Sequence, residues 1–202
     1  MNSLSPSSRY ILPQFEERTP HGTRTQDPYS RLFRDRIIFL GTQIDEISAN
    51  DIMSQLLVLE AIDAEQSITM YINSPGGSFS DMTAIYDTMQ HIKPDVATVC
   101  LGKAVSSSAI LLAGGTKGMR AALPNARIVL DQPAVYGNGR GQASDINIQA
   151  SEIKRTRTWI EETLADITGQ SVAKIAKDVE RNFYLSAQEA LEYGIIDEVL
   201  TK

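Results

Sequence analysis

Segments rich in β-forming residues alternate with segments of helical periodicity along most of the chain, and this alternation constrains the fold more than any other feature. Each β-rich run ends at a turn that contains glycine, and an amphipathic segment follows. The pattern is typical of an α/β domain with a largely parallel sheet and right-handed crossovers. The first predicted strands lie at residues 37–40, 67–73 and 95–101.

The predicted helices follow from apolar side chains that recur at three- and four-residue spacings. Ser48 is the predicted cap of the first helix. Its apolar stripe comprises Ile52, Met53, Leu56, Leu57, Leu59 and Ile62. The second helix contains Met82, Ile85, Tyr86 and Met89. The other predicted elements are a small-residue helix at 106–113, a strand at 127–130, a polar helix at about 143–167, a shorter helix from Ser171, a helix capped at Ser186, and a strand at 195–200.

Length and composition predict one soluble domain. The chain has 202 residues, 42% of them hydrophobic and 22% charged, and its net charge of −6 offers no basic surface to nucleic acid. No stretch approaches the roughly 18 apolar residues of a membrane helix, and no secretory signal is present. A single cysteine, Cys100, excludes an internal disulfide and a zinc cluster. These features predict a cytoplasmic protein without a metal.

The first 27 residues differ in composition from the rest of the chain. They are rich in Ser, Pro, Thr and Arg, which is typical of a flexible arm or a removable segment. One of the two histidines, His21, lies in this arm.

Two predicted strand-to-helix turns are suited to an oxyanion. At Gly76-Gly77 and at residues 102–106, a strand gives way to a turn of glycine or small residues. Unpaired backbone N–H groups at both turns would point into a common crevice. The alternative is that these glycines only form tight turns.

Several ordered motifs resemble those of a known family. They are YINSPGGSFSDMTAIYDTM at 71–89, GKAVSSSAILLAGGTKG at 102–118, ALPNARIVLDQP at 122–133, GQASDINIQASEI at 141–153 and LSAQEALEYGIIDEVL at 185–200. Together they resemble ClpP, the proteolytic subunit of the ATP-dependent Clp protease, from about Ile11 to Leu200. The N-terminal part and the residues ILLAGGTKG most resemble those of actinobacterial members of the ClpP family.

The resemblance implies an α/β fold of the ClpP/crotonase superfold type, with repeated ββα units and a long handle helix at about 143–167. It also implies two stacked heptameric rings around a closed chamber, which receives unfolded polypeptide from a hexameric AAA+ unfoldase. By the same resemblance, residues 1–27 form a flexible propeptide and axial-loop arm, and residues 28–202 form the ClpP-like domain. The propeptide would span roughly ten residues.

The family is similar to other serine peptidases in using a Ser-His-Asp triad. Its motifs place the nucleophile at Ser106 and the oxyanion-hole amides at Gly77 and Ser107. The histidine position in LPNARIVLDQP holds Asp131, and the aspartate position in DVERN holds Asn182. The match therefore implies an intact oxyanion hole beside an incomplete triad.

An aspartate is a poor substitute for the histidine. Its ordinary pKa is about 3.9, against about 6.5 for histidine, so it is a weaker base and returns a proton poorly to a leaving amine. An Asn182 amide that donated to Asp131 would weaken this base further. Loss of the base in a known triad costs about 10⁶ in rate. We therefore expect no peptide hydrolysis by the family's mechanism.

Other candidate bases are disfavoured by their positions. His21 lies in the arm, and His91 ends a helix one strand before the site. Lys103 stands where the family usually has glutamine, and a desolvated lysine can activate a serine. A solvated lysine has a pKa near 10.4, however, which argues against a Ser106-Lys103 pair. Cys100 is expected to be a small core residue.

Further positions match the family's assembly surfaces. Glu180 and Arg181 match a pair near the ring–ring interface that links assembly to site geometry. A surface pocket for unfoldase loops and acyldepsipeptide antibiotics matches Tyr71, His91, Val99 and Leu101. Core packing is the alternative for Val99 and Leu101, because they alternate along a strand.

Three hypotheses about function follow. The favoured one is a catalytically impaired ClpP subunit that acts as structural or regulatory partner of an active ClpP paralogue and an AAA+ unfoldase. The second is an active ATP-dependent serine endopeptidase in which Ser106 uses Asp131 or Lys103 as base. The third is a crotonase-like acyl-CoA enzyme, since that superfamily shares the oxyanion hole without a triad. The favoured hypothesis needs no cofactor in this chain, because the unfoldase uses the ATP.

Overall fold

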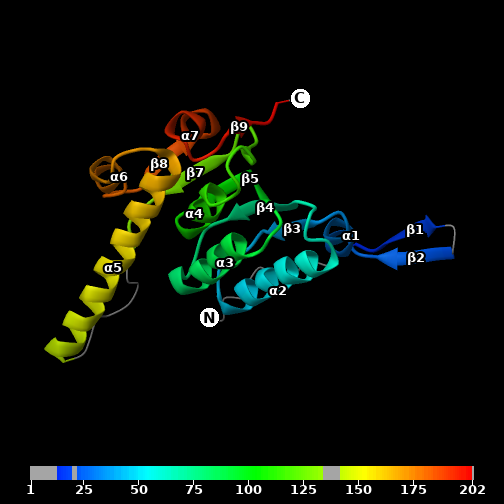
Figure 1. The fold of residues 1–202 in the computed structure, drawn as a ribbon, viewed down its shortest axis with the longest axis horizontal. Helices are drawn as coiled ribbons and strands as arrows, with labels where there is room; N and C mark the ends of the chain where they lie inside the picture. Colours follow the sequence, from blue (N-terminus) through cyan, green and yellow to red (C-terminus); the bar gives the residue numbers. More distant parts are fainter. Residues whose placement is uncertain (1–12, 20–21, 134–141, 202) are drawn as a thin grey trace, which may run out of the picture.

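A mainly parallel β-sheet forms the centre of the molecule (Figure 1). The computed structural model describes residues 13–19, 22–133 and 142–201. Within these ranges the sheet strands are β3 (Ile37–Leu40), β4 (Ile68–Ser74), β5 (Val96–Val105), β6 (Arg120–Ala122), β7 (Arg127–Leu130), β8 (Phe183–Ser186) and β9 (Glu198–Val199). Strands β3, β4, β5, β6 and β9 are neighbours in that order, and β7 pairs with β5 and β8. All these pairs except β7–β8 are parallel, which confirms the predicted α/β class.

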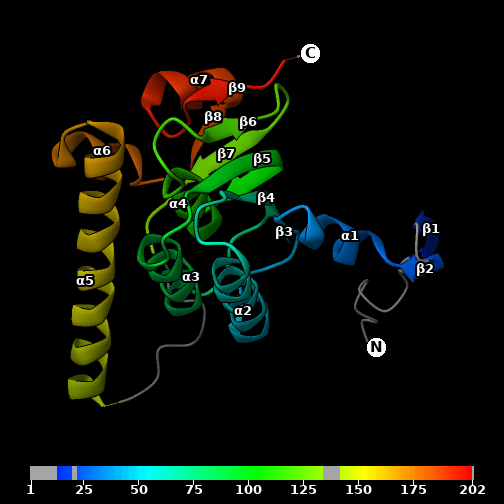
Figure 2. The ribbon, with the colours of Figure 1, turned by 45° about the vertical axis from the view of Figure 1, so that its right-hand side comes forward.

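Helices cover the sheet and extend beyond it. The described ranges contain α1 (Pro28–Arg34), α2 (Glu46–Ile62), α3 (Phe79–His91), α4 (Ser107–Ala113), α5 (Ala143–Thr168), α6 (Val172–Asp178) and α7 (Ala187–Tyr193). Helices α2 and α3 lie side by side and pack on the sheet (Figures 1 and 2). They bury Ile52, Leu56 and Ile85 in one core with strand residues Met70 and Ile72. None of these helices is both long and apolar enough to cross a membrane.

Helix capping agrees with the sequence at one of two predicted positions. Ser186 is the N-cap of α7, as predicted, and the helix expected from Ser171 is α6, with Ser171 as its N-cap. The prediction for α2 is wrong, because Asp45 is its N-cap and Ser48 is the third helical residue. The two side chains form a capping box, in which each satisfies the other's backbone N–H.

The apolar stripe of α2 is narrower than predicted. Ile52, Leu56 and Leu59 are buried, whereas Leu57 is 49% and Ile62 67% exposed. Leu57 directly follows Leu56, and successive helical side chains point about 100° apart, so only one of the two faces the core.

Gly102 does not end a strand, contrary to the prediction. Strand β5 continues through it to Val105, and the register with β4 shifts between Ile72 and Ser74. A Cβ on Gly102 would lie 2.8 Å from the Asn73 side chain. Glycine therefore permits a bulge at which β5 passes from pairing with β6 to pairing with β7.

A β-hairpin, which the composition did not predict, forms part of the N-terminal arm. Strands β1 (Phe15–Thr19) and β2 (Gly22–Gln26) pair antiparallel and project on the side opposite α5 (Figure 1). Glu17 on β1 accepts a hydrogen bond of 2.7 Å from Gln26 Nε2 on β2, and a second of 2.7 Å from Arg34 Nη2, which attaches the hairpin to α1. The Arg34 contact is the main cause that lowers the pKa of Glu17. Most of the predicted propeptide and His21 lie outside the described residues.

The predicted long helix is confirmed as α5. It begins at Ala143 and ends at Thr168, where the C-cap Gly169 adopts the left-handed conformation with φ of 71°. The helix runs alongside the sheet domain and extends well beyond it (Figure 2). Trp159 anchors it to α3 through edge-on ring contacts with Phe79 and Tyr86, each with 5.4 Å between ring centroids.

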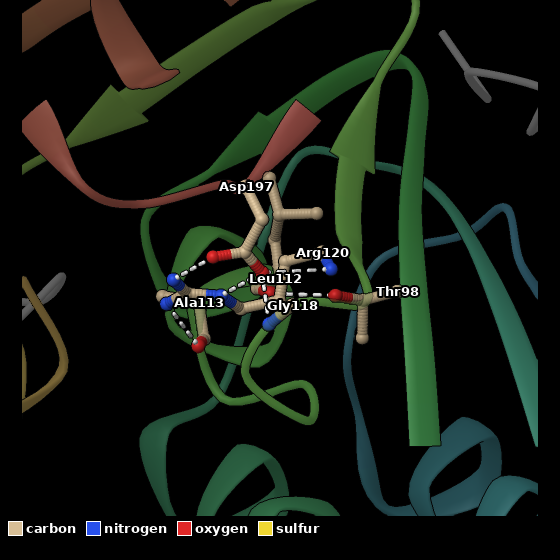
Figure 3. A network of polar contacts seen from close by, with 6 residues as sticks. All are labelled: Thr98, Leu112, Ala113, Gly118, Arg120 and Asp197. Atoms are coloured by element: carbon tan, nitrogen blue, oxygen red, sulfur yellow. Dashed lines mark hydrogen bonds and ion pairs between the residues drawn. The ribbon is translucent and has the colours of Figure 1, made fainter. Parts of the chain in front are cut away.

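A largely buried ion pair joins the residue before the last strand, β9, to the neighbouring strand β6 (Figure 3). Asp197 accepts from Arg120 Nη2 at 2.6 Å and from Arg120 Nε at 2.8 Å. The same carboxylate accepts the backbone N–H groups of Gly118 and Arg120. The Arg120 side chain is only 5% exposed, and Nη1 donates to the Ala113 carbonyl at the end of α4. This pair therefore links β6, β9 and α4.

Candidate active site

The site lies at the edge where three adjacent strands end. Strands β4, β5 and β7 are parallel neighbours, so their carboxyl ends meet at the same edge of the sheet. Gly77 follows β4, Ser106 follows β5 and Asp131 follows β7. Open α/β sheets bind ligands at such strand ends.

All five predicted residues of the catalytic site line one cavity of about 620 Å³. They are Gly77, Ser106, Ser107, Asp131 and Asn182. Phe79, Ile110 and Ile160 add apolar surface to the same wall. The cavity thus combines a hydroxyl, backbone amides and a carboxyl with an apolar surface, which is the usual composition of a site for a peptide or other organic ligand.

Ser106 occupies a strained turn between β5 and α4. Its backbone angles are φ 55° and ψ −124°, in a region that residues with a Cβ rarely adopt. Its N–H donates to the Val129 carbonyl at 2.8 Å, which holds the turn against β7. Nucleophilic serines of α/β-hydrolases occupy a similar strand-to-helix elbow. The backbone therefore holds Ser106 in the type of turn that such serines occupy.

The glycines beside Ser106 are required by close backbone packing. A Cβ on Gly76, whose φ is 82°, would lie 2.4 Å from the Val105 carbonyl oxygen. A Cβ on Gly77 would lie 2.0 Å from the Ile44 carbonyl oxygen. The alternative that these glycines only form a tight turn is therefore incomplete, because they also bring the chain against the elbow of Ser106.

One of the two backbone N–H groups predicted to form the oxyanion hole already has a hydrogen-bond acceptor, contrary to the prediction. The Gly77 N–H donates to Ser107 Oγ at 2.8 Å, and this hydroxyl is also 3.3 Å from the Gly77 carbonyl oxygen, to which it donates. The Ser107 N–H begins α4 and has no intrahelical acceptor. One of the two predicted donors is thus occupied by the chain's own side chain.

Asp131 is a half-buried carboxyl that faces Ser106. Burial raises its pKa above the ordinary value, and interaction with the Ser106 side chain offsets part of this rise. The carboxyl of Asp131 is therefore more basic than the ordinary pKa of aspartate indicates. The raised pKa makes Asp131 a better base than a solvated aspartate.

Asn182 lies beside Asp131 because of the β7–β8 pairing. Leu130 and Phe183 are partners in this antiparallel ladder, so the next residues, Asp131 and Asn182, lie opposite each other. Both line the cavity, but no hydrogen bond joins the side chains of these two described residues. The suggested Asn182 donation to the carboxylate is therefore absent from this structure.

The other candidate bases do not reach the cavity. Lys103 is exposed on β5 in register with Arg127, and it does not line the cavity. His91 is the exposed last residue of α3. Cys100 is fully buried, as predicted, and burial raises the pKa of its thiol to about 12, so the thiol is unreactive. Among the described residues, Asp131 is thus the titratable side chain that reaches Ser106.

Arg157, which sequence reasoning missed, fixes the segment next to Asp131. Its guanidinium donates to Gln132 Oε1 at 2.9 Å, to Glu161 Oε1 at 2.7 Å and to Glu180 Oε2 at 3.2 Å. Gln132 Nε2 also donates to the Glu180 carbonyl at 3.0 Å. The only visible sequence signal for this network was the four-residue spacing of Arg157 and Glu161 on one helix.

The predicted assembly residues occupy two separate places. Glu180 pairs with Arg157, whereas Arg181 is exposed and its side chain forms no hydrogen bond or ion pair within the described part of the chain. Tyr71 and Val99 are partners on β4 and β5, and Leu101 follows on the same face of β5. His91 lies on a different element, at the end of α3.

The raised pKa of Asp131 has a consequence for stability. Between the unfolded pKa, about 3.9, and the raised folded pKa, the folded chain binds more protons, so its stability falls as pH increases through this window. Asp131→Asn is therefore expected to raise Tm at pH 7–8, with a gain that vanishes near pH 4. For a chain of this length, each 1 kcal/mol gained in the free energy of unfolding raises Tm by about 2–4 °C.

Thermal melts of the chain and the variant between pH 4 and 8 measure this difference. Asp51→Asn, which changes an exposed carboxyl of α2, provides the control and should show no such trend. An Asp131→Asn variant that is less stable than the original chain at pH 7.5 would show that the carboxylate is stabilising.

The fold and site define an α/β protein with a serine elbow and apposed backbone amides, the arrangement used for acyl transfer. Comparison with known sequences agrees. The profile of the Clp protease family matches residues 20–202. The chain belongs to the Clp protease family.

Three relatives illustrate the similarity, and each carries the name of an ATP-dependent Clp protease proteolytic subunit. Subunit 1 of Bifidobacterium longum is 63% identical over 196 residues, which cover 97% of this chain and 84% of the relative. Subunit 1 of Tropheryma whipplei is 60% identical over 197 residues, which cover 98% of this chain and 95% of the relative. Subunit 2 of Leifsonia xyli is also 60% identical over 197 residues, which cover 98% of this chain and 88% of the relative.

Proposed function

We propose that this chain is a ring subunit of a Clp-type protease that has little or no peptidase activity of its own. The observation that carries the proposal is the side chain facing Ser106, which is the carboxyl of Asp131 instead of an imidazole. The position that would orient an imidazole holds the uncharged Asn182. Asp131 directly follows β7 and Asn182 directly precedes β8, so the two departures lie opposite each other and alter one catalytic unit.

The chemistry of a carboxyl limits what Ser106 can do. During acylation a base must take the hydroxyl proton and then deliver it to the leaving amine. The raised pKa of Asp131 helps the first step, but a carboxyl remains a weaker base than an imidazole unless its pKa approaches neutrality. Loss of a triad base costs about 10⁶ in known cases, so a partial correction leaves a slow enzyme.

One specific observation favours a second candidate function, an active serine endopeptidase with Asp131 as base. The carboxyl interacts with Ser106, and burial raises its pKa, as a general base at neutral pH requires. The variant of this hypothesis with Lys103 lacks such support, because Lys103 is exposed away from the cavity. Membership in the Clp protease family argues against the crotonase-like acyl-CoA alternative.

As a family subunit, the chain is proposed to assemble with an active ClpP paralogue in stacked heptameric rings, beside an AAA+ unfoldase that supplies unfolded polypeptide. Its relatives carry the numbers 1 and 2 in their names, which supports the existence of paired subunits. The Glu180 and Arg181 pair is proposed to act at the ring–ring interface. Tyr71, Val99 and Leu101, together with His91, are proposed to contact the unfoldase.

Peptidase assays of the purified chain and its Ser106→Ala variant test the proposal. We expect the two proteins to hydrolyse a fluorogenic dipeptide at the same background rate, because Ser106 lacks an effective base. A serine-reactive phosphonate is expected to label the original chain only weakly. Turnover by the original chain that disappears in Ser106→Ala would overturn the proposal. If the turnover is also lost in Asp131→Asn, the chain is an active serine endopeptidase that uses Asp131 as its base.

A further inference from the structure

The Ser107 hydroxyl binds both polar groups of Gly77. It accepts from the Gly77 N–H at 2.8 Å and donates to the Gly77 carbonyl at 3.3 Å. Ser107 is 4% exposed, so water does not compete freely for either contact. The close approach of Gly77 to the Ile44 backbone leaves this loop little room to move away. The contact is therefore a fixed part of the site.

This contact competes with catalysis at the oxyanion hole. When Ser106 Oγ bonds to a substrate carbonyl carbon, the π electron pair of that carbonyl moves to its oxygen, and the hydroxyl proton passes to the base. The resulting oxyanion needs backbone N–H donors about 2.7–3.1 Å away. The Gly77 N–H carries one proton, which already points to Ser107 Oγ. The oxyanion would have to displace the hydroxyl to use it.

We propose that Ser107 is a positioning residue that closes half of the oxyanion hole and keeps the site slow independently of Asp131 and Asn182. This inference rests on the proposed function, in which the subunit has lost its own peptidase activity. The occupied Gly77 N–H is a second physical cause of the lost peptidase activity, beside the missing imidazole base. Correcting the triad alone would therefore restore only part of the rate.

The test compares kinetics in a background whose triad has been corrected. Asp131→His/Asn182→Asp is assayed on a fluorogenic dipeptide with and without Ser107→Ala. Removal of one oxyanion donor typically costs about 10²- to 10³-fold, so release of the Gly77 N–H is expected to raise kcat about 10- to 100-fold. KM should stay within about twofold, because the oxyanion forms only after binding.

Ser108→Ala in the same background is the matched control. It removes a neighbouring buried hydroxyl that contacts Ser74 and Val105 but does not touch Gly77. We expect it to give no increase in kcat. If the Ser107→Ala variant fails to assemble, Ser107→Cys replaces it. The cysteine side chain has a similar volume, but its sulfur is a weaker hydrogen-bond acceptor than a hydroxyl, so we expect a smaller increase in kcat.

An unchanged or lower kcat in Ser107→Ala, or in the Ser107→Cys substitute, overturns the inference. An equal gain from Ser108→Ala also overturns it, because the effect would then be general loosening of α4. The proposed function fails separately, when the original chain shows turnover that depends on Ser106. Either result can occur without the other, so the two failures are distinguishable.

Discussion

Substituting Asp131→His together with Asn182→Asp is expected to raise the peptidase kcat of the chain by about 10²- to 10⁴-fold. The β7–β8 register places positions 131 and 182 opposite each other at the cavity, so a new imidazole and its orienting carboxylate would meet beside Ser106. The gain stays below the roughly 10⁶-fold value of a complete triad because Ser107 still occupies the Gly77 amide. Initial rates on a fluorogenic dipeptide measure it.

Two controls define the source of this gain. Each single substitution should give much less than the pair, because triad members act as a unit. Adding Ser106→Ala to the pair should return the rate to background. If the double variant stays at background even after Ser107→Ala, then the cavity does not have the geometry that the strand ends indicate, and the account of the site is wrong.

Asp197→Ala is expected to cause the largest loss of stability, about 3–5 kcal/mol in the free energy of unfolding. The substitution leaves the Arg120 guanidinium, whose side chain is 5% exposed, without its counter-ion, and it removes the acceptor of the Gly118 N–H. At roughly 2–4 °C per kcal/mol, Tm should fall by about 6–20 °C. Urea unfolding and thermal melts at a fixed protein concentration measure both quantities.

The ion pair also predicts a pH dependence. Hydrogen bonds from Arg120 are the main cause that lowers the pKa of Asp197 in the folded chain. The resulting stability is fully present above the unfolded pKa, about 3.9, and is lost as pH falls through the folded value. The difference between the original chain and Asp197→Ala should therefore shrink in acid.

A surface ion pair provides the control for this experiment. Lys93 and Glu65 form a salt bridge whose side chains are 65% and 76% exposed, so Glu65→Ala should cost no more than about 1 kcal/mol. A loss of stability in Asp197→Ala no larger than that in Glu65→Ala would contradict the prediction, and would mean that water reaches Arg120.

The elements best predicted from sequence are those whose signal lies in their own residues. The strands at 37–40 and 127–130 were placed to the residue, and α5 began where the polar periodicity began. The sequence does not predict strands β6 and β8, because each is short and is a strand only through its hydrogen bonds to a neighbouring strand. Gly102 was misjudged because glycine marks a bulge as readily as a turn.

The site divides in the same way. Motifs with fixed spacing identified Ser106, Asp131 and Asn182, and the strand topology brings them to one cavity. The occupied Gly77 amide and the raised pKa of Asp131 could not be predicted, because they depend on a side-chain direction and on burial by distant residues. Those two properties decide what the site can do, since they set the free donors and the strength of the base.

The hydrogen bonds of Arg157 connect α5 to the chain segment beside Asp131. At 1.5 Å per residue, the helix reaches about 20 Å beyond Arg157 towards Ala143 and away from the sheet (Figure 2). Arg157 holds Gln132, the neighbour of Asp131. Because α5 is one continuous helix, a tilt of its outer end would displace Arg157, and the hydrogen bond from Arg157 to Gln132 would pass that displacement to the residue next to Asp131.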